Sequence, residues 1–282
     1  MIIPLIIALV VLTVASYTDL KTREVPDWLN YSLVSAGLGL GLIYSLIFWQ
    51  WSYILNSLAG FLIFLGFALL MFYAGQWGGG DSKMLMGLGA LIGLDLSFSK
   101  FPFLVNFLFN LVVIGGIFGI IWSLALAFKR WRKFKKEFAN VLGKKMFRVI
   151  RTCLLAGSLI LILLFLFFIK RMEIFLLVFL LFVFLVYYLF AFVKAVEKAC
   201  MFKFVKPKQL TEGDWIVKNV FIEGKKITGP KDLGISKKQI AKLRKLSPDR
   251  DILIKEGIPF VPSFLVAFII TWIFGNLMFL VV

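Results

Sequence analysis

Long apolar stretches alternate with short polar or basic segments along most of this chain. A membrane-spanning helix needs about 20 predominantly apolar residues, at a rise of about 1.5 Å per residue. By this measure the pattern predicts eight spans, at residues 1–18, 30–48, 54–77, 82–98, 101–128, 152–169, 174–193 and 259–282. We therefore expect an all-α polytopic membrane protein.

The stretch from Trp28 to Gly80 contains no charged side chain. It is too long for one span, and its middle, residues 48–53, has the aromatic composition of a membrane interface. It therefore predicts a helical hairpin. Farther along, Asn106 and Asn110 lie four residues apart on one helix face, where we expect them to hydrogen-bond a neighbouring helix instead of binding a ligand.

Only the segment 196–258 is polar and charged over a long distance. Residues 215–222 have strand character, residues 223–226 resemble a turn, and Ser236 is placed to cap a basic helix that ends at Leu246. These signals predict a small α+β cytoplasmic domain inserted before the last helix. The expected organisation is a catalytic membrane domain at 1–128, a basic loop with two further membrane helices at 129–195, the small basic domain at 196–258 and a last span at 259–282.

Composition supports the membrane location, and charge predicts the orientation. The chain is 61% hydrophobic with a mean hydropathy of +0.95, which excludes a soluble globule. Its formal net charge is +17, and the basic residues cluster between spans. With the N-terminus outside, all of them except Lys100, Lys170 and Arg171 fall on the cytoplasmic side, as the positive-inside rule favours. Anionic membrane lipids are expected partners and nucleic acid is not, while the oligomeric state stays open.

The scarcity of metal-binding and nucleophilic side chains narrows the possible chemistry. Histidine is absent, and Cys153 and Cys200 are the only cysteines. This excludes a Ser/His/Asp triad, a His-ligated zinc ion and a paired-cysteine metal site. We expect no metal and no cofactor, so any catalysis rests on carboxylates.

Two aspartates follow apolar stretches at the predicted cytoplasmic ends of spans. Asp81 comes directly after Gly78-Gly79-Gly80, and Asp19 ends the first apolar stretch. An ionisable group in the membrane costs about 2.5 to 3.5 kcal/mol on insertion scales, so such groups commonly serve function. Two carboxylates that share one proton can activate water and polarise a peptide carbonyl. The residues alone leave two other interpretations open: Asp81 caps the next helix, or coupled acids serve proton-driven transport.

Gly78-Gly79-Gly80-Asp81, together with the segment 19–29 (DLKTREVPDWL), resembles the type IV prepilin peptidases, particularly the archaeal preflagellin and prepilin peptidases. The resemblance covers about residues 1–128. It implies a GxGD intramembrane aspartic endopeptidase that removes the short basic leader from prepilin or preflagellin precursors at the cytoplasmic membrane face. It also implies that Asp19 and Asp81 form the catalytic dyad, with Gly78 and Gly80 as motif glycines. The two-helix insert and the basic domain depart from the shortest archaeal members, and the cysteine-rich zinc loop of two-domain bacterial relatives is missing.

For five further residues, two acids, two prolines and one lysine, the sequence leaves two interpretations open. Glu24 and Asp27 are expected either to attract the basic leader or to be ordinary solvated loop residues. Pro259 and Pro262 either leave backbone groups free to pair with an extended substrate or simply begin the last helix. Lys83 either lowers the pKa of the neighbouring acid or extends toward the membrane interface.

Two functions other than proteolysis remain open at this point. A proton- or cation-coupled transporter would use the same two aspartates, whereas a non-catalytic assembly scaffold would not need them. We favour the peptidase because both acids are expected at one membrane face. A translocation path would carry polar groups through the membrane, and the spans at 152–169 and 174–193 show none.

Overall fold

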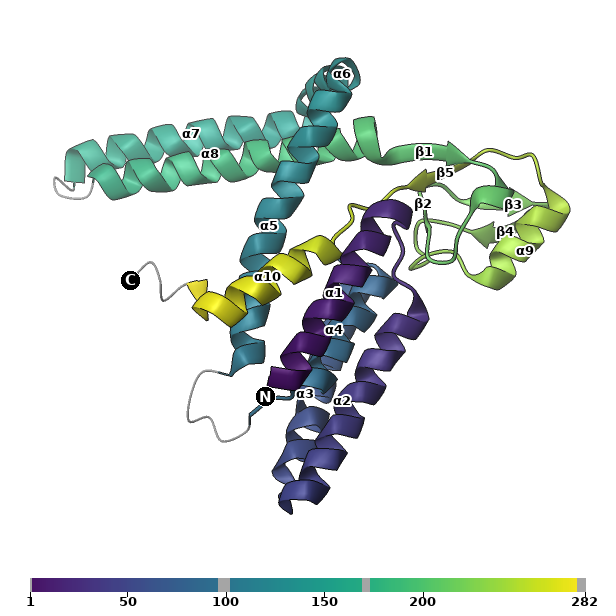
Figure 1. Cartoon of the computed structure of the whole chain (residues 1–282). Helices are drawn as coiled ribbons and strands as arrows, with labels where there is room; N and C mark the ends of the chain where they lie inside the picture. Colours follow the sequence, from purple (N-terminus) through teal and green to yellow (C-terminus); the bar gives the residue numbers. More distant parts are fainter. Residues whose placement is uncertain (1, 96–101, 169–172, 278–282) are drawn as a thin grey trace. The chain divides into compact units, whose positions relative to one another are not determined.

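The computed structural model describes residues 2–95, 102–168 and 173–277 (Figure 1). The chain divides into two compact units, the first made of Met1–Ile121 and Val205–Val282 and the second of Trp122–Phe204. The three basic residues expected outside the cell, Lys100, Lys170 and Arg171, lie outside the described residues, as do the ends of the predicted spans 82–98 and 259–282.

The first unit is a helical bundle with a small mixed domain. Its helices are α1 (Ile2–Thr22), α2 (Asp27–Phe48), α3 (Ser52–Tyr73), α4 (Gly79–Ile92), the first part of α5 (Phe103–Lys129) and α10 (Val261–Phe274). The predicted hairpin is confirmed, because α2 ends before Trp49, which takes the left-handed conformation, and α3 begins three residues later. In Figure 1, α1 lies beside α10, and the two helices contact each other.

Glycines allow α2, α3 and α4 to approach one another closely. A Cβ placed on Gly37 of α2 would lie 2.4 Å from backbone atoms of Ala90 in α4. A Cβ on Gly60 of α3 would lie 2.3 Å from the carbonyl oxygen of Gly89. Such distances exclude any side chain without backbone movement, so small residues are what permit the close packing at this interface.

Two asparagines of α5 hold the end of α10. The Asn110 side-chain amide donates to the Thr271 hydroxyl (2.9 Å) and to the Gly275 carbonyl (2.7 Å), and its oxygen accepts from the Leu277 amide (3.1 Å). Asn276 donates to the side-chain oxygen of Asn106 at 3.1 Å. The prediction of a bond to a neighbouring helix is confirmed for Asn110, through Thr271 of α10, whereas Asn106 bonds the segment that follows this helix.

The small domain of the first unit is built on short strands and one helix. Its elements are β1 (Phe202–Val205), η2 (Pro207–Gln209), β2 (Trp215–Ile216), β3 (Val220–Ile222), β4 (Lys225–Thr228), α9 (Lys237–Leu246) and β5 (Ile252–Lys255). One sheet has the order β1-β5-β2, with β2 and β5 antiparallel and Ile216 opposite Ile254. A second sheet pairs β3 with β4, also antiparallel, with Ile222 opposite Lys225.

Sequence expectations for this domain hold with two refinements. The Ser236 hydroxyl accepts from the Gln239 amide at the start of α9, as predicted. The single strand expected at 215–222 is instead two strands, β2 and β3. The turn is confined to Glu223 and Gly224, which both have positive φ, and the lysines that follow them belong to β4.

The second unit corrects one expectation. Residues 129–151, expected as a basic loop, are helical, because α5 runs to Lys129 and is followed by α6 (Trp131–Gly143) and by α7 (Lys145–Phe168). Helix α6 has an apolar face among its charged residues, because Phe134, Phe138 and Val141 recur at helical spacing. With this face α6 packs against α8 (Glu173–Val196). A short π-helix, η1 (Glu197–Met201), follows α8.

Six of the described helices are long and apolar enough to cross a membrane, in agreement with a multi-pass membrane protein. They are α1, α2, α3, α5, α7 and α8. The two other expected spans correspond to α4 and α10, each of 14 residues, which is shorter than a spanning helix requires. The count of eight spans is therefore not confirmed.

Candidate active site

Asp19 lies in the last turn of α1 and is buried, with 6% of its surface exposed. Helix α1 continues through Thr22 and ends where Arg23 takes a positive φ of 61°. The sequence reading ended the first span at residue 18, yet Asp19 is part of the helix and not of the loop. Its Oδ2 accepts a hydrogen bond of 2.9 Å from the backbone amide of Val261, in the first turn of α10.

Asp81 lies in the first turn of α4, three residues after the cap position. Its Oδ2 accepts from the backbone amide of Gly78 at 3.1 Å, so this carboxylate does bind the start of its own helix. Gly79 and Gly80, expected in a turn before the helix, belong to that first turn. A Cβ on Gly80 would be in ordinary contact with Val25, at 3.4 Å.

The environment of Asp81 favours its protonated form. Asp81 precedes the predicted fourth span and lies outside the six candidate membrane helices. Burial of its carboxyl and, second, the negative charge of Asp19 raise the pKa of Asp81 to about 7, while the hydrogen bond from the Gly78 amide opposes both effects. The Asp19 charge acts at Asp81 because α1 and α4 pack against each other. The structure thus brings together the two acids that the sequence selected.

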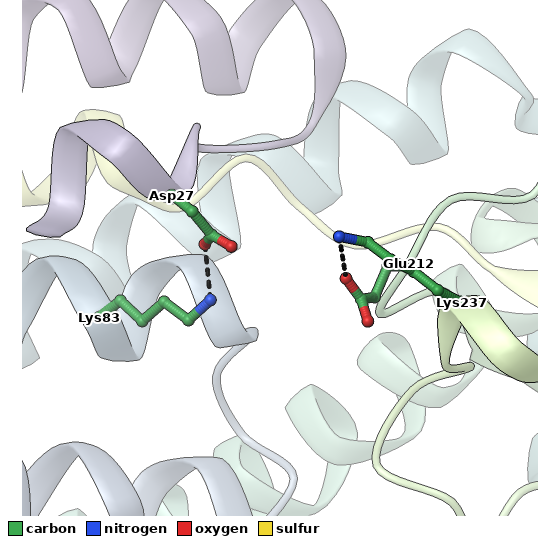
Figure 2. Close-up of polar contacts among 4 residues, drawn as sticks. All are labelled: Asp27, Lys83, Glu212 and Lys237. Atoms are coloured by element: carbon green, nitrogen blue, oxygen red, sulfur yellow. Dashed lines mark hydrogen bonds and ion pairs between the residues drawn. The ribbon is translucent and has the colours of Figure 1, made fainter.

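Asp27 and Lys83 form an ion pair that joins the start of α2 to α4 (Figure 2). The Lys83 ammonium also lies over the ring of Tyr31, 5.6 Å from its centre. Lys83 is not among the groups that shift the pKa of Asp81, so neither role predicted for this lysine describes its main contact. Asp27 is engaged by Lys83 and is therefore less available to a basic leader than a free loop acid.

Glu24 has a different setting, in the exposed loop between α1 and α2. Its charge, with that of Glu256, raises the pKa of Asp214 in the small domain, although burial of Asp214 is the largest cause of that shift. On the same domain Glu212 pairs with Lys237 at 3.3 Å (Figure 2). The carboxylates of Glu24, Asp214 and Glu256 therefore lie near one another.

Pro262 lies in the first turn of α10, and Pro259 is buried just before it. A proline at a helix start loses no hydrogen bond, so the plainer interpretation of Pro262 is confirmed. Of the two residues between these prolines, Val261 makes a contact that the sequence did not predict. Its backbone amide donates to the Asp19 carboxylate. No sequence signal distinguishes this amide from others.

The sequence reading also missed three buried polar side chains. Ser16, Asn30 and Ser82 lie on α1, α2 and α4, and their side-chain polar atoms have no hydrogen-bond partner among the described residues. Asn30 is fully buried, and neither its amide nitrogen nor its oxygen is paired. An unpaired buried polar group costs about 1 to 3 kcal/mol, so their retention calls for a polar partner from outside the chain.

Residues 6–122 match the sequence model of the type IV leader peptidase family. This confirms the predicted resemblance. The family segment covers α1 to α4 and most of α5, including both aspartates. Among the described residues, no cluster of three or more histidine, cysteine or acidic side chains is arranged to hold a metal ion.

Curated relatives of the family segment are preflagellin peptidases of methanogens. The protein of Methanocaldococcus jannaschii is 44% identical over 89 residues, or 31% of this chain and 37% of the relative. Those of Methanococcus maripaludis and Methanococcus voltae are each 38% identical, over 81 and 86 residues, or 29% and 30% of this chain and 35% and 36% of the relatives. The matches thus span about a third of the length of these relatives.

Proposed function

We propose that this protein is a membrane-embedded aspartic endopeptidase that removes the basic leader from preflagellin or related prepilin precursors at the cytoplasmic membrane face. The observation that carries the proposal is the pair Asp19 and Asp81 within the segment that matches the type IV leader peptidase family: Asp19 is buried, Asp81 is half-buried, and the charge of Asp19 acts on Asp81. The preflagellin peptidases similar to this segment supply the substrate class. The clustering of basic residues supplies the orientation.

The chemistry follows from sharing one proton between two carboxylates. Two like charges close together do not both ionise easily, so at neutral pH one acid of the pair keeps its proton. The ionised member takes a proton from water as the water oxygen attacks the scissile carbonyl carbon. The protonated member donates to the carbonyl oxygen, and the resulting tetrahedral diol collapses with a proton transferred to the leaving amine.

In this proposal, the unpaired polar side chains near the dyad bind the water molecules that the reaction uses. Ser82 follows Asp81 directly, Ser16 lies one turn before Asp19, and Asn30 lies on the inner face of α2 against Gly87 of α4. Buried water molecules typically make about three hydrogen bonds to otherwise unpaired polar groups. Such waters would satisfy these side chains and reach an otherwise apolar site.

The precursor leader is basic in this family, and an exposed acid, Glu24, lies in the loop that follows the helix of Asp19. The charges of Glu24 and Glu256 act on Asp214, in a chain whose net charge is +17. We assign leader attraction to Glu24 with these two acids of the small domain. Asp27 is assigned to the ion pair that holds α2 on α4.

The deciding experiment uses the full chain reconstituted in liposomes with preflagellin of Methanocaldococcus jannaschii, and reads the new N-terminus by mass spectrometry. Asp19→Asn and Asp81→Asn are each expected to abolish cleavage while the protein remains inserted and folded. The control Asp249→Asn changes a carboxylate whose side chain is 92% exposed, and should cleave as the wild type does.

Each other outcome identifies a different function. Cleavage that persists in either dyad variant would remove the two-aspartate mechanism. A wild type that cuts neither this precursor nor a panel of prepilins would remove the peptidase. Proton or cation flux that depends on both acids would then indicate a transporter, and partner binding unaffected by Asp81→Asn would indicate a scaffold.

A further inference from the structure

The segment from Glu256 to Val261 links the small domain to α10 and contacts the elements that carry both aspartates. The Arg23 guanidinium, just past α1, donates to the Gly257 carbonyl at 3.2 Å. The Val261 amide donates to Asp19 Oδ2 at 2.9 Å. Both ends of the segment are thus held near the C-terminal end of α1, by Arg23 at Gly257 and by the Asp19 carboxylate at Val261.

The same segment reaches the other aspartate through an aromatic cluster. The Phe260 ring lies 5.8 Å from the ring of Trp77, centre to centre, and Trp77 also contacts Phe264 at 5.6 Å. Trp77 directly precedes Gly78, whose amide binds Asp81. On the opposite side Gly115 of α5 leaves room for Phe260, since a Cβ there would lie 2.6 Å from its ring. Phe260 therefore contacts Trp77, which precedes the Gly78 donor of Asp81, and Val261 supplies the donor of Asp19.

The hydrogen-bond partners of the two carboxylates are unequal. Asp19 interacts with the backbone amides of Val261 and Phe260, at the start of α10, and with the positive charge of Arg23. The N-terminal end of a helix carries partial positive charge, which stabilises an anion. Asp81 has the single amide of Gly78 and faces the negative charge of Asp19. The amide donors and the Arg23 cation are thus concentrated on Asp19, whereas Asp81 has one amide donor.

We propose that the backbone amide of Val261 is a positioning donor that holds Asp19 as the ionised, water-activating member of the dyad and leaves Asp81 as the proton donor. This inference rests on the proposed peptidase function and divides the roles within it. It also makes the segment 256–261 the connection through which the small domain constrains the catalytic carboxylate.

The division of roles gives a balanced reaction. Asp19 removes one proton from water as the water oxygen bonds to the scissile carbonyl carbon, and Asp81 gives its proton to the carbonyl oxygen. In the second step the C–N bond breaks, the proton held by Asp19 passes to the leaving nitrogen, and Asp81 regains its proton from the diol. The products are a carboxylic acid and an amine, and both aspartates return to their starting states.

Val261→Pro tests the donor directly because proline lacks the amide hydrogen. Its fixed φ suits the first position of a helix, where Val261 lies, and Pro262 already follows. With reconstituted enzyme and Methanocaldococcus jannaschii preflagellin, we expect kcat to fall roughly 100-fold with KM unchanged, since positioned proton transfer contributes about that much. Val261→Ala keeps the amide and removes only buried methyl groups, and is expected to keep kcat within a few-fold.

A variant that preserves the backbone shape covers the case in which Val261→Pro does not fold. Replacing Val261 with its α-hydroxy analogue changes one amide to an ester, which deletes the donor and retains the side chain. It is expected to show the same loss of kcat. Wild-type kcat in the ester variant, or equal losses in Val261→Pro and Val261→Ala, would overturn the inference.

The failure of this inference is distinguishable from failure of the proposed function. Wild-type cleavage together with full cleavage by both donor-deletion variants would leave the peptidase intact and remove only the role of Val261. Absence of cleavage by the wild type would remove the peptidase and, with it, the division of roles.

Discussion

Asp81 combines a structural contact with an altered acidity. It binds the Gly78 amide at the start of α4, and its pKa is raised to about 7 by burial first and by the Asp19 charge second. Helix capping and proton donation are compatible, since a protonated carboxyl keeps an oxygen that accepts from the amide. The two interpretations that the sequence left open therefore need not exclude each other.

The raised pKa of Asp81 predicts how stability and activity depend on pH. Because the pKa in the folded protein lies above the ordinary aspartate value of 3.8, the folded protein binds this proton more tightly than the unfolded chain does. The contribution of Asp81 to the unfolding free energy is therefore greatest below pH 3.8 and is lost as the pH rises to about 7. Thermal unfolding of wild type and Asp81→Asn in lipid nanodiscs, from pH 5 to 8, should show wild type losing stability relative to the variant.

Cleavage provides the second readout of the same proton. If Asp81 is the donor, the rate should decline as the pH rises through about 7, where its proton is lost. A cleavage rate that rises steadily from pH 6 to 9 would contradict a proton donor at this position.

Asn30 and Asn110 form a matched pair of buried asparagines. Asn110 has three hydrogen bonds, whereas the side chain of Asn30 has none within the described residues. Asn110→Leu is expected to destabilise the protein by about 1 to 3 kcal/mol, because polar groups of α10 lose their partner. Asn30→Leu should leave the melting temperature unchanged or raise it, yet lower cleavage if Asn30 holds the site's water.

The asparagine comparison needs unfolding and cleavage measured on the same samples. A structural role for Asn30 would appear as a loss of melting temperature similar to that of Asn110→Leu. Full cleavage by a stable Asn30→Leu protein would instead show that no water essential to the reaction binds there.

At the scale of elements, the position of Asp81 depends on how α4 packs between α2 and α3. The three helices meet at glycines whose missing Cβ atoms permit backbone contact, at Gly37, Gly60 and Gly89. Small residues serve this purpose in membrane helices because no hydrophobic driving force from water acts between them. The ion pair of Asp27 with Lys83 joins the N-terminal ends of the same α2 and α4 pair.

Gly37→Ala is expected to displace α4 and reduce both stability and cleavage. The new Cβ would lie 2.4 Å from the Ala90 backbone, and overpacking of this kind costs about 1 to 3 kcal/mol. Gly39→Ala is the control, because a Cβ at Gly39 meets no atom within 4 Å. Alanine favours helix over glycine, so Gly39→Ala should be neutral or stabilising in a thermal unfolding assay. Equal behaviour of the two variants would show that close packing at Gly37 does not matter.

At the scale of the whole molecule, the chain combines a type IV leader peptidase segment with a small domain and a separate helical unit. The small domain is part of the first unit, where Trp215 lies against Gly75 in the turn before α4. The second unit has its own core, in which the Tyr187 hydroxyl donates to the Phe147 carbonyl at 3.0 Å. The family match ends at residue 122, where the second unit begins.

We assign the exposed lysines of α6 to anionic lipid headgroups. Lys133, Lys135 and Lys136 are exposed, while the apolar face of the helix is buried on α8. Each basic residue near an anionic surface contributes about 1 kcal/mol. Changing all three to glutamate should reduce any stimulation of cleavage by anionic over zwitterionic liposomes, and changing all three to arginine should preserve it. A glutamate variant with unchanged lipid response would refute the assignment.

Sequence alone was enough for the membrane class, the hairpin at α2 and α3 and the Ser236 cap, and it also selected Asp19 and Asp81, whose catalytic role stays a prediction. Each depends on local composition, spacing or a short motif, and these features are visible in neighbouring residues of the sequence. The helix α6 was missed because its charges outnumber the apolar residues that define its buried face. Its secondary structure depended on a partner, α8, that lies about fifty residues farther along.

Only the tertiary structure decided which groups contact the acidic side chains at the site. The Val261 amide comes 242 positions after Asp19, and the partner of Asp27 comes 56 positions after it. A backbone amide is identical in every residue but proline, so no pattern marks the one that meets a carboxylate. The sequence determines which residues can take part in chemistry. The packing of the helices, which excludes water and brings α10 against α1, determines which of these residues act together.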